Sequence, residues 1–128
     1  MHAKISTRSP MERPLIQPDE IYVASFPFGD TAGMKLRPVL TLTGPLGSVP
    51  EVLVAYISSV NPDPLLPSNI VLDPATSEYR QTNLKTKSAL RLHKLATIHT
   101  SAVVRRLGQL SAITIAEVDQ KLRALLNL

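Results

Sequence analysis

Short apolar runs separated by turn-forming residues dominate the first half of the chain. Residues 21–26, Ile-Tyr-Val-Ala-Ser-Phe, have strand composition, and Pro27 ends the run because proline cannot donate a ladder hydrogen bond. Pro38 opens a second predicted strand, residues 39–43, and residues 52–57 form the near-continuous apolar run of a buried central strand. The turn formers between these two strands predict an antiparallel hairpin with a seven-residue loop.

The middle of the chain predicts shorter strands. Residues 61–67 contain three prolines and form an irregular excursion, since proline restricts its own backbone and that of the preceding residue. Residues 73–86 are predicted to be a polar loop. The strands predicted in this part are residues 70–72, 88–92, 95–98 and 103–107. So many short strands in so little sequence predict a mainly β fold, a small barrel.

Helical spacing of apolar residues is found at the C-terminal end. The apolar positions are Ile115, Val118, Leu122, Leu125 and Leu126. Thr114 and Glu117 fit a capping box, and Ser111 offers an earlier cap, which leaves the start of the helix open between the two. We expect this amphipathic helix to pack its apolar stripe on the barrel.

The composition fits one domain with an aliphatic core, because 44% of the 128 residues are hydrophobic and only 4% are aromatic. The chain has no Cys, which excludes disulfides, thiolate metal sites and cysteine nucleophiles. No apolar run approaches the ~20 residues of a membrane helix, and the first 20 residues hold no signal-peptide stretch, so we expect a cytoplasmic protein without membrane contact. Residues 1–18 are expected to form a flexible arm before a single domain at 19–128.

The positive charge is unevenly placed. The chain carries 14 Lys and Arg against 10 Asp and Glu, a net charge of +4. Residues 79–116 contain no acidic residue and hold Arg80, Lys85, Lys87, Arg91, Lys94, Arg105 and Arg106. Clustered charge of one sign attracts polyanions, whereas the alternative is a solvated basic face without a partner.

Six segments resemble, in order, the PemK/MazF-like toxins of bacterial toxin–antitoxin systems. They are Phe26-Pro-Phe-Gly-Asp30, Lys35-Leu-Arg-Pro-Val-Leu40, Val54-Ala-Tyr-Ile-Ser-Ser59, Leu84-Lys-Thr-Lys-Ser88, Arg91-Leu-His-Lys-Leu-Ala-Thr97 and Leu107-Gly-Gln-Leu-Ser111. The resemblance runs from about Asp19 to Leu128. It implies an SH3-like barrel with a C-terminal helix, a homodimer, and a metal-independent endoribonuclease that cleaves single-stranded RNA. It also implies a cognate antitoxin, one segment of which covers the RNA groove.

The resemblance also assigns candidate catalytic residues. The Arg of the family's Arg-Pro motif falls on Arg37, the Thr or Ser after the buried strand on Ser58, and the second basic position on Arg91. An acid that takes part in proton transfer in some members is replaced here by His93. The loop at residues 30–35 also departs from the family pattern, so substrate sequence preference does not transfer.

The chemistry of RNA cleavage suits these residue types. Attack by the substrate's own 2′-hydroxyl needs a base, an acid and fixed positive charge at the phosphorane. Arg37 offers a planar fork that stays protonated, and Ser58 offers a hydrogen bond to a nonbridging oxygen. His93 titrates near neutrality, and it shares a strand face with Arg91 if the leucines on either side of Arg91 face the core. The predicted RNA contacts are Lys35, Ser59, Lys85, Lys87 and Lys94.

Other chemistries find little support in the sequence. His2, His93 and His99 lack metal-ligand spacing, so no metal and no cofactor is expected. The glycine pair Gly29 and Gly33 is not followed by the Gly-Lys-Ser/Thr ending of a P-loop. Two alternatives stay open. One is a non-catalytic SH3-like barrel that acts by binding protein, as the related gyrase-inhibiting CcdB-like toxins do or as a degenerate binder, and the other is action through a dimer interface alone.

Overall fold

The computed structural model describes residues 15–26, 35–60 and 66–128. Six antiparallel strands form one sheet in the order β4-β5-β3-β2-β1-β6. The strands are β1 (Glu20–Phe26), β2 (Lys35–Thr41), β3 (Glu51–Ser58), β4 (Asn69–Leu72), β5 (Ser88–His99) and β6 (Val103–Gln109). The helices are the 3-10 helices η2 (Ser77–Thr82) and η3 (Thr100–Ala102) and the α-helix α1 (Ala112–Leu126).

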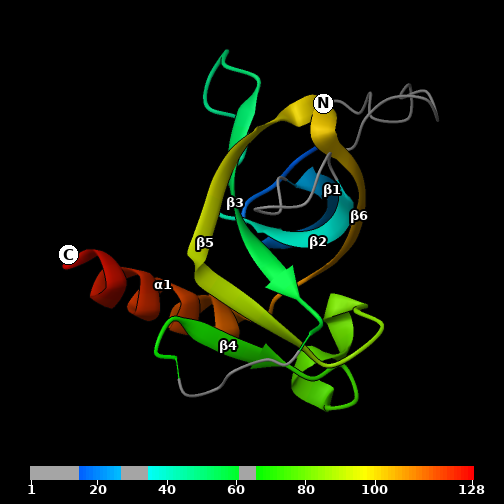
Figure 1. The fold of residues 1–128 in the computed structure, drawn as a ribbon, viewed down its shortest axis with the longest axis vertical. Coiled ribbons are helices and arrows are strands. Elements are labelled where there is room, and N and C mark those ends of the chain that lie inside the picture. Colours follow the sequence, from blue (N-terminus) through cyan, green and yellow to red (C-terminus); the bar gives the residue numbers. More distant parts are fainter. Residues whose placement is uncertain (1–14, 27–34, 61–65) are drawn as a thin grey trace, which may run out of the picture.

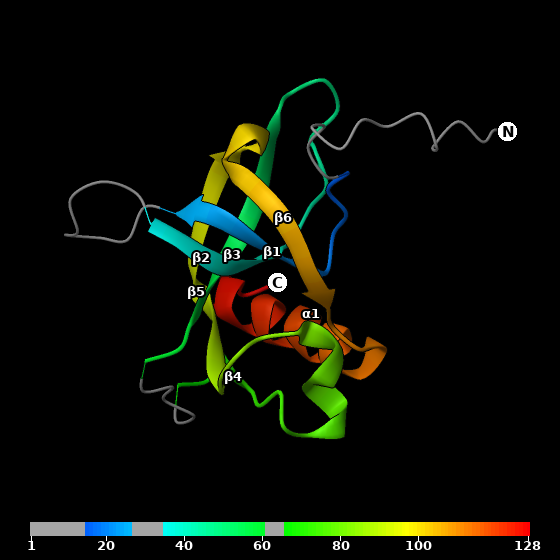
Figure 2. The same ribbon diagram turned by 90° about the vertical axis from the view of Figure 1, so that its right-hand side faces the viewer.

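The sheet curls on itself into a half-barrel, and α1 lies beneath the curl beside β5 (Figure 1, Figure 2). This arrangement confirms the predicted mainly β class with a barrel-like sheet and a C-terminal helix. The predicted hairpin is also confirmed, because β2 pairs antiparallel with β3. Its connection is residues 42–50, longer than predicted, since β2 ends at Thr41.

Two hydrophobic cores lie on the two faces of the sheet. Val54 and Ala55 are consecutive in β3 yet belong to different cores, because successive side chains of a strand point to opposite faces. The helix-side core joins strand residues to Val118 of α1 and contains Ile21, Leu40, Ala55, Ile57, Ile70, Leu72, Leu84, Leu90, Leu92, Leu110 and Val118. The far-side core contains Ile16, Tyr22, Ala24, Val39, Val52, Val54, Ile98 and Val103.

Strand β2 starts earlier than the sequence predicted. The prediction had Pro38 open the strand, whereas β2 begins at Lys35 and runs through the proline. Pairing with β3 covers only residues 39–41, so Pro38 lies where β2 has β1 as its single neighbour. Proline is tolerated at such an edge because no ladder hydrogen bond is needed on the open side.

Strand β5 replaces two predicted strands. Residues 88–92 and 95–98 were predicted separately, but they form one strand with an irregularity between them. Opposite Ala55 and Tyr56 of β3, the partner jumps from Leu95 to Arg91. The residues between these two partners therefore form a β-bulge, and such a bulge bends a strand without ending it.

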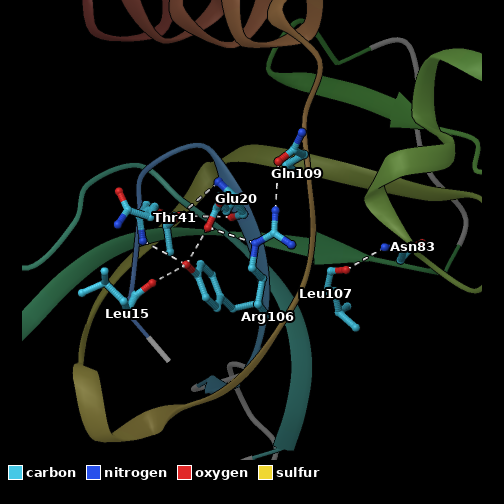
Figure 3. A network of polar contacts seen from close by, with 9 residues as sticks. Leu15, Glu20, Thr41, Asn83, Arg106, Leu107 and Gln109 are labelled. Atoms are coloured by element: carbon cyan, nitrogen blue, oxygen red, sulfur yellow. Dashed lines mark hydrogen bonds and ion pairs between the residues drawn. The ribbon is translucent and has the colours of Figure 1, made fainter. Parts of the chain in front are cut away.

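The predicted polar loop at residues 73–86 contains η2, which packs closely on β6. A Cβ atom added at Gly108 would lie 2.2 Å from the Gln81 carbonyl oxygen and 2.6 Å from that of Thr82, so only glycine fits there. After η2, Asn83 takes a left-handed conformation with φ of 57°, and its Nδ2 donates to the Leu107 carbonyl at 2.8 Å (Figure 3). These contacts fix the backbone just before Lys85.

The helix begins at the earlier of its two possible caps. The Ser111 hydroxyl accepts the Thr114 N–H at 3.2 Å, and α1 starts at Ala112, so the capping box at Thr114 is not the N-terminus. The Glu78 carboxylate accepts hydrogen bonds from the hydroxyls of both Ser111 and Thr114. The helix dipole stabilises a carboxylate beside a helix N-terminus. Because Glu78 belongs to η2, this contact ties η2 to α1.

A buried tyrosine attaches residues 15–18 to the sheet. The Tyr22 hydroxyl donates to Glu20 Oε1 at 2.8 Å and accepts the Gln17 N–H at 2.9 Å, while Glu20 also pairs with Arg106 at 3.1 Å (Figure 3). Burial, with a further contribution from Glu20, raises the pKa of Tyr22 to about 12. Ile16 is 6% exposed in the far-side core, so the last residues of the expected arm pack on the domain. Residues 1–14 of that arm lie outside the described chain.

Candidate functional site

Three of the predicted catalytic residues lie on one face of the sheet, the face that carries the far-side core. Val39 pairs with Tyr56, and Tyr56 pairs with Arg91. Arg37 lies two residues before Val39 and therefore on the same face. Extending the β2–β3 register by two residues brings Arg37 level with Ser58. The sheet thus places two arginines and a serine on three adjacent strands.

Arg37 and Ser58 differ in exposure. Arg37 is exposed near the start of β2, and its Nη1 donates to the Leu36 carbonyl at 2.9 Å. Ser58 is only 5% exposed, at the end of β3. Its hydroxyl oxygen accepts the Val60 N–H at 3.3 Å, a contact that uses a lone pair and not the hydroxyl proton. The serine therefore keeps the capacity to donate a hydrogen bond to an incoming oxyanion.

Arg91 lies in the interior of this face. Its side chain is half-buried on β5, and its Nε is buried with no hydrogen-bond partner among the described residues. A buried guanidinium nitrogen without a partner leaves free energy to be gained from an anionic ligand, since an unsatisfied donor is costly.

His93 lies in the β5 bulge beside Ser68, with Nδ1 2.7 Å from the Ser68 hydroxyl. Burial, together with the positive charges of Arg91 and Lys94, lowers the pKa of His93 below its ordinary value of 6.5. The influence of Arg91 on this pKa agrees with the predicted neighbourhood of the two side chains. At neutral pH the imidazole is therefore uncharged, the state that can accept a proton.

Tyr56 is a residue of this face that the sequence reasoning did not single out. It pairs with Arg91 across the strands, and the Lys94 Nζ lies 5.6 Å from its ring centroid, within the range of a cation–π contact. The sequence offered one sign of it, a polar aromatic residue in the otherwise aliphatic segment 52–57. That segment alone does not show which face of the sheet the tyrosine occupies. The cation–π contact holds Lys94, a predicted RNA contact, beside Tyr56.

A second group of predicted residues lines a cavity of about 360 Å³ on the opposite, helix-side face. Ser59 and Lys85 line it, joined by Arg105, which the sequence analysis had counted only as part of the basic segment. Arg37 lines this cavity as well, so it lies at the boundary of both faces. Lys35 and Lys87 are exposed and are not among the lining residues. The predicted site is therefore divided between two surfaces that meet at Arg37.

Two further properties concern the part of the chain that the structure describes. Within it, no group of three or more His, Cys, Asp and Glu side chains is arranged to hold a metal ion. Neither is any of its helices long and apolar enough to span a membrane.

Solved structures with the same fold include several toxins. The chain is similar to the toxin MazF-mt6 of Mycobacterium tuberculosis with a TM-score of 0.66 and 22% identity, over 85% of this chain and 97% of that one. It is similar to MazF from Deinococcus radiodurans with a TM-score of 0.66 and 16% identity, over 90% and 99% of the two chains. An endoribonuclease in complex with its cognate antitoxin, from a mycobacterial species, gives a TM-score of 0.65 and 14% identity over 88% and 96%. At these identities the similarity establishes the fold.

The family follows from the sequence as a whole. None of the curated proteins is similar enough to this chain to match it. The sequence pattern of the PemK-like, MazF-like toxins of type II toxin–antitoxin systems, however, matches residues 17–126, which include every strand of the described chain and all of α1. The chain belongs to this family of PemK-like, MazF-like toxins of type II toxin–antitoxin systems.

Proposed function

We propose that this toxin is a metal-independent endoribonuclease that cleaves single-stranded RNA at short sequences and so inhibits growth. The observation that carries the proposal is the placement of Arg37, Ser58 and Arg91 on adjacent strands of one sheet face. Among its relatives of the same fold is a protein named as an endoribonuclease from a mycobacterial species.

The reaction begins with attack of a 2′-hydroxyl oxygen on the neighbouring phosphorus. That oxygen forms a bond to phosphorus, the bond from phosphorus to the 5′-oxygen breaks, and the products are a 2′,3′-cyclic phosphate and a 5′-hydroxyl. Negative charge grows on the nonbridging oxygens in the transition state. Arg37 and Arg91 offset that charge, and the Ser58 hydroxyl donates a hydrogen bond to it.

Proton transfer is assigned to His93. Its lowered pKa keeps the imidazole neutral at pH 7, so it accepts the proton that leaves the 2′-hydroxyl. The leaving 5′-oxygen takes up a proton, which the resulting imidazolium can return. The contact with Ser68 holds the ring through Nδ1 and leaves Nε2 for the substrate.

The test is incubation of the purified protein with long single-stranded RNA in EDTA, followed by mapping of the new ends. We expect 2′,3′-cyclic phosphate ends at a recurrent sequence. Arg37→Ala should lower the cleavage rate by at least about 100-fold, the usual effect of removing a charge-stabilising donor. Arg123→Ala is the matched control, because Arg123 is an exposed arginine of α1 paired with Asp119.

Two outcomes contradict the proposal. One is RNA that stays intact with the wild-type protein, which would favour a non-catalytic toxin that acts by binding protein. The other is cleavage that Arg37→Ala leaves unchanged.

The partners we propose are a cognate antitoxin and a second copy of the chain. A relative of the same fold from Deinococcus radiodurans is named as a MazE–MazF structure. Exposed apolar side chains support a homodimer, since Leu36 is 53%, Val60 70% and Val104 46% exposed. Sedimentation should show a dimer at micromolar concentration, and a monomer alone would contradict it. We also propose that the toxin acts in the cytoplasm, because its proposed substrate is RNA.

A further inference from the structure

His93 lies in a part of β5 that strand pairing does not hold. The bulge leaves residues 92–94 without a partner on β3, since the pairing jumps from Leu95 to Arg91. On the other side of β5, the pairing with β4 extends only to Asn69, opposite Arg91. The side chain of His93 is exposed, so core packing does not fix its ring. The orientation of the imidazole therefore depends on its polar contact with a residue outside β5.

Ser68 makes that contact from a turn that is attached to β5. The turn is closed by the Asn69 N–H, which donates to the Leu66 carbonyl at 3.0 Å. The Leu92 N–H donates to the Ser68 carbonyl at 3.0 Å, while the Ser68 hydroxyl lies 2.7 Å from Nδ1 of His93. The backbone and the side chain of one serine thus bind two consecutive residues of the bulge.

Helix α1 holds the same turn from the other side. Lys121 Nζ donates to the Pro67 carbonyl at 2.9 Å. Lys121 also pairs with Glu117 at 3.9 Å, and both line a cavity of about 440 Å³ together with Pro67 and Ser68. Because the charges of this pair offset each other, α1 adds little net charge near His93. The Ser68 hydroxyl is therefore presented from a backbone that two elements fix, which lowers the entropy lost when it holds the ring.

The contact with Ser68 also decides which nitrogen of the His93 ring carries the proton. A neutral imidazole has one N–H, and the partner of one ring nitrogen sets the state of the other. If the Ser68 hydroxyl donated to Nδ1, the ring proton would lie on Nε2, and Nε2 would have no lone pair for a second proton. If Nδ1 donates to the hydroxyl oxygen, Nε2 keeps its lone pair. Of the two arrangements, this one allows Nε2 to act as a base.

We propose that Ser68 is a positioning residue for the cleavage reaction, whose hydroxyl oxygen accepts the Nδ1 proton of His93 and so keeps a lone pair on Nε2. This inference deepens the proposed ribonuclease function and rests on it. In the reaction, the proton of the attacking 2′-hydroxyl passes to Nε2, and the imidazolium retains its Nδ1–H bond to Ser68. A charged donor strengthens that hydrogen bond, so Ser68 stabilises the form of His93 that appears as the base takes up its proton.

His99 offers a comparison within the same chain, because its Nδ1 has the opposite role. The Ser101 hydroxyl also lies 2.7 Å from Nδ1, but here the Ser101 backbone N–H donates to the same nitrogen at 3.0 Å. A nitrogen that accepts a backbone N–H carries no proton in the neutral ring, so neutral His99 holds its proton on Nε2. The chain therefore contains two Ser–His contacts of equal length, in which we expect opposite tautomers.

The first experiment is NMR of the full chain with 15N-labelled histidine, at about pH 8, above the ordinary histidine pKa of about 6.5. His93→Gln and His99→Gln identify the two sets of ring signals. We expect His93 to carry its proton on Nδ1 and His99 on Nε2. Ser68→Ala should turn the His93 signals into those of a mixture of both tautomers, whereas Ser101→Ala should leave them unchanged. A wild-type His93 that carries its proton on Nε2 overturns the inference.

Kinetics test the effect on catalysis. Ser68→Ala should lower kcat for a long RNA about 10-fold with KM unchanged, since one hydrogen bond that orients the base is lost. The acidic limb of the kcat profile should move to lower pH, because the imidazolium loses an acceptor that stabilises it. Arg91 and Lys94, the charged neighbours of His93 on β5, are present in every variant, so the shift reports the serine contact.

Two further variants complete the kinetic test. Ser68→Thr keeps the hydroxyl and should restore the wild-type kcat and pH profile. Ser101→Ala is the matched control, because it removes an equal contact from the other histidine, and it should retain the wild-type profile. An acidic limb that Ser68→Ala moves to higher pH would show that the hydroxyl donates to Nδ1, which overturns the inference.

The outcomes separate this inference from the ribonuclease proposal. Cleavage that depends on Arg37 but is unchanged by Ser68→Ala overturns the positioning role and leaves the ribonuclease proposal intact. Failure of the wild-type protein to cleave any RNA overturns the ribonuclease proposal, whereas an Nδ1–H tautomer of His93 that Ser68→Ala removes still supports the pairing of the two residues. Circular dichroism spectra identical to that of the wild type show that each variant folds.

Discussion

Two kinds of positive charge operate at the proposed site, and they respond differently to pH. Arg37 and Arg91 supply guanidinium groups, which are fixed positive charges in proteins. His93 changes its charge with pH, and burial together with the positive charges of Arg91 and Lys94 lowers its pKa and favours the neutral form. The fixed charges suit stabilisation of a phosphorane, and the variable one suits proton transfer.

The pH dependence of cleavage tests this division at the level of one residue. Because the pKa of His93 is below 6.5, the cleavage rate should stay constant near pH 7 and fall only at lower pH, as the imidazole becomes protonated. His93→Gln should lower the rate by about 100-fold or more and remove this acidic limb. His99→Gln is the control, since His99 is an exposed histidine that binds Ser101. An acidic limb that His93→Gln retains would contradict the assignment.

The same lowered pKa affects stability. The unfolded chain binds a proton at His93 more readily than the folded chain, so the contribution of this residue to stability is fully present above pH 6.5. It is lost as the pH falls through the pKa of the folded state. His93→Gln should therefore flatten the pH dependence of the urea midpoint below pH 6.5.

At the residue scale, the sequence predicted the candidate side chains better than their orientation. Ser58 and Ser59 are consecutive, yet one lies on the Arg91 face and the other lines the cavity. Which serine faces which way depends on the register of β3, and a shift of one residue would exchange them. The role of Arg105 was hidden for the same reason, because its neighbours come from β1 and β2 rather than from adjacent sequence.

At the scale of elements, η2 packs closely against β6. Of the glycines in the described chain, Gly108 of β6 lies closest to the backbone of another element. Gly108 permits it, and the contact positions the segment that carries Lys85. Local sequence gave no sign of this packing, since residues 77–82 have the polar composition of a loop. The bulge in β5 was hidden in a similar way, because periodicity alone cannot distinguish one irregular strand from two short ones.

Gly108→Ala tests the role of this contact. The added Cβ would overlap two backbone carbonyls, so we expect a loss of about 1–3 kcal/mol in the free energy of unfolding, measured by urea denaturation. RNA binding should weaken as well, because the Lys85 segment must move. Gly44→Ala is the matched control, since its nearest atom would be the Ile16 carbonyl oxygen at 3.4 Å. Equal stability of the two variants would contradict this account.

Considered as a whole, the molecule has two cores that share the same strands. β3 contributes Val52 and Val54 to the far-side core and Ile57 to the helix-side core, and β5 is divided in the same way. The order of the strands and the family resemblance allowed the overall class to be predicted. The existence of two cores did not follow from the sequence, because it depends on how strongly the sheet curls.

Because the two cores share strands, we expect them to unfold together. Val118→Ala removes two methyl groups from the helix-side core and should cost about 1.5 kcal/mol. The urea midpoints of the amide NMR signals of Val54 in the far-side core and Leu92 in the helix-side core should coincide and shift by the same amount. A Val54 signal that keeps its wild-type midpoint would show that the cores are independent.

Strand β6 forms one open end of the sheet, and an unpaired strand edge invites other chains to add to it. That edge carries two exposed arginines, Arg105 and Arg106, of which Arg106 is paired with Glu20. Repulsion between copies then opposes the stacking from which fibrils grow. Arg105 therefore helps to protect the free toxin from aggregation, and replacing it with a neutral residue should lower the solubility of the toxin.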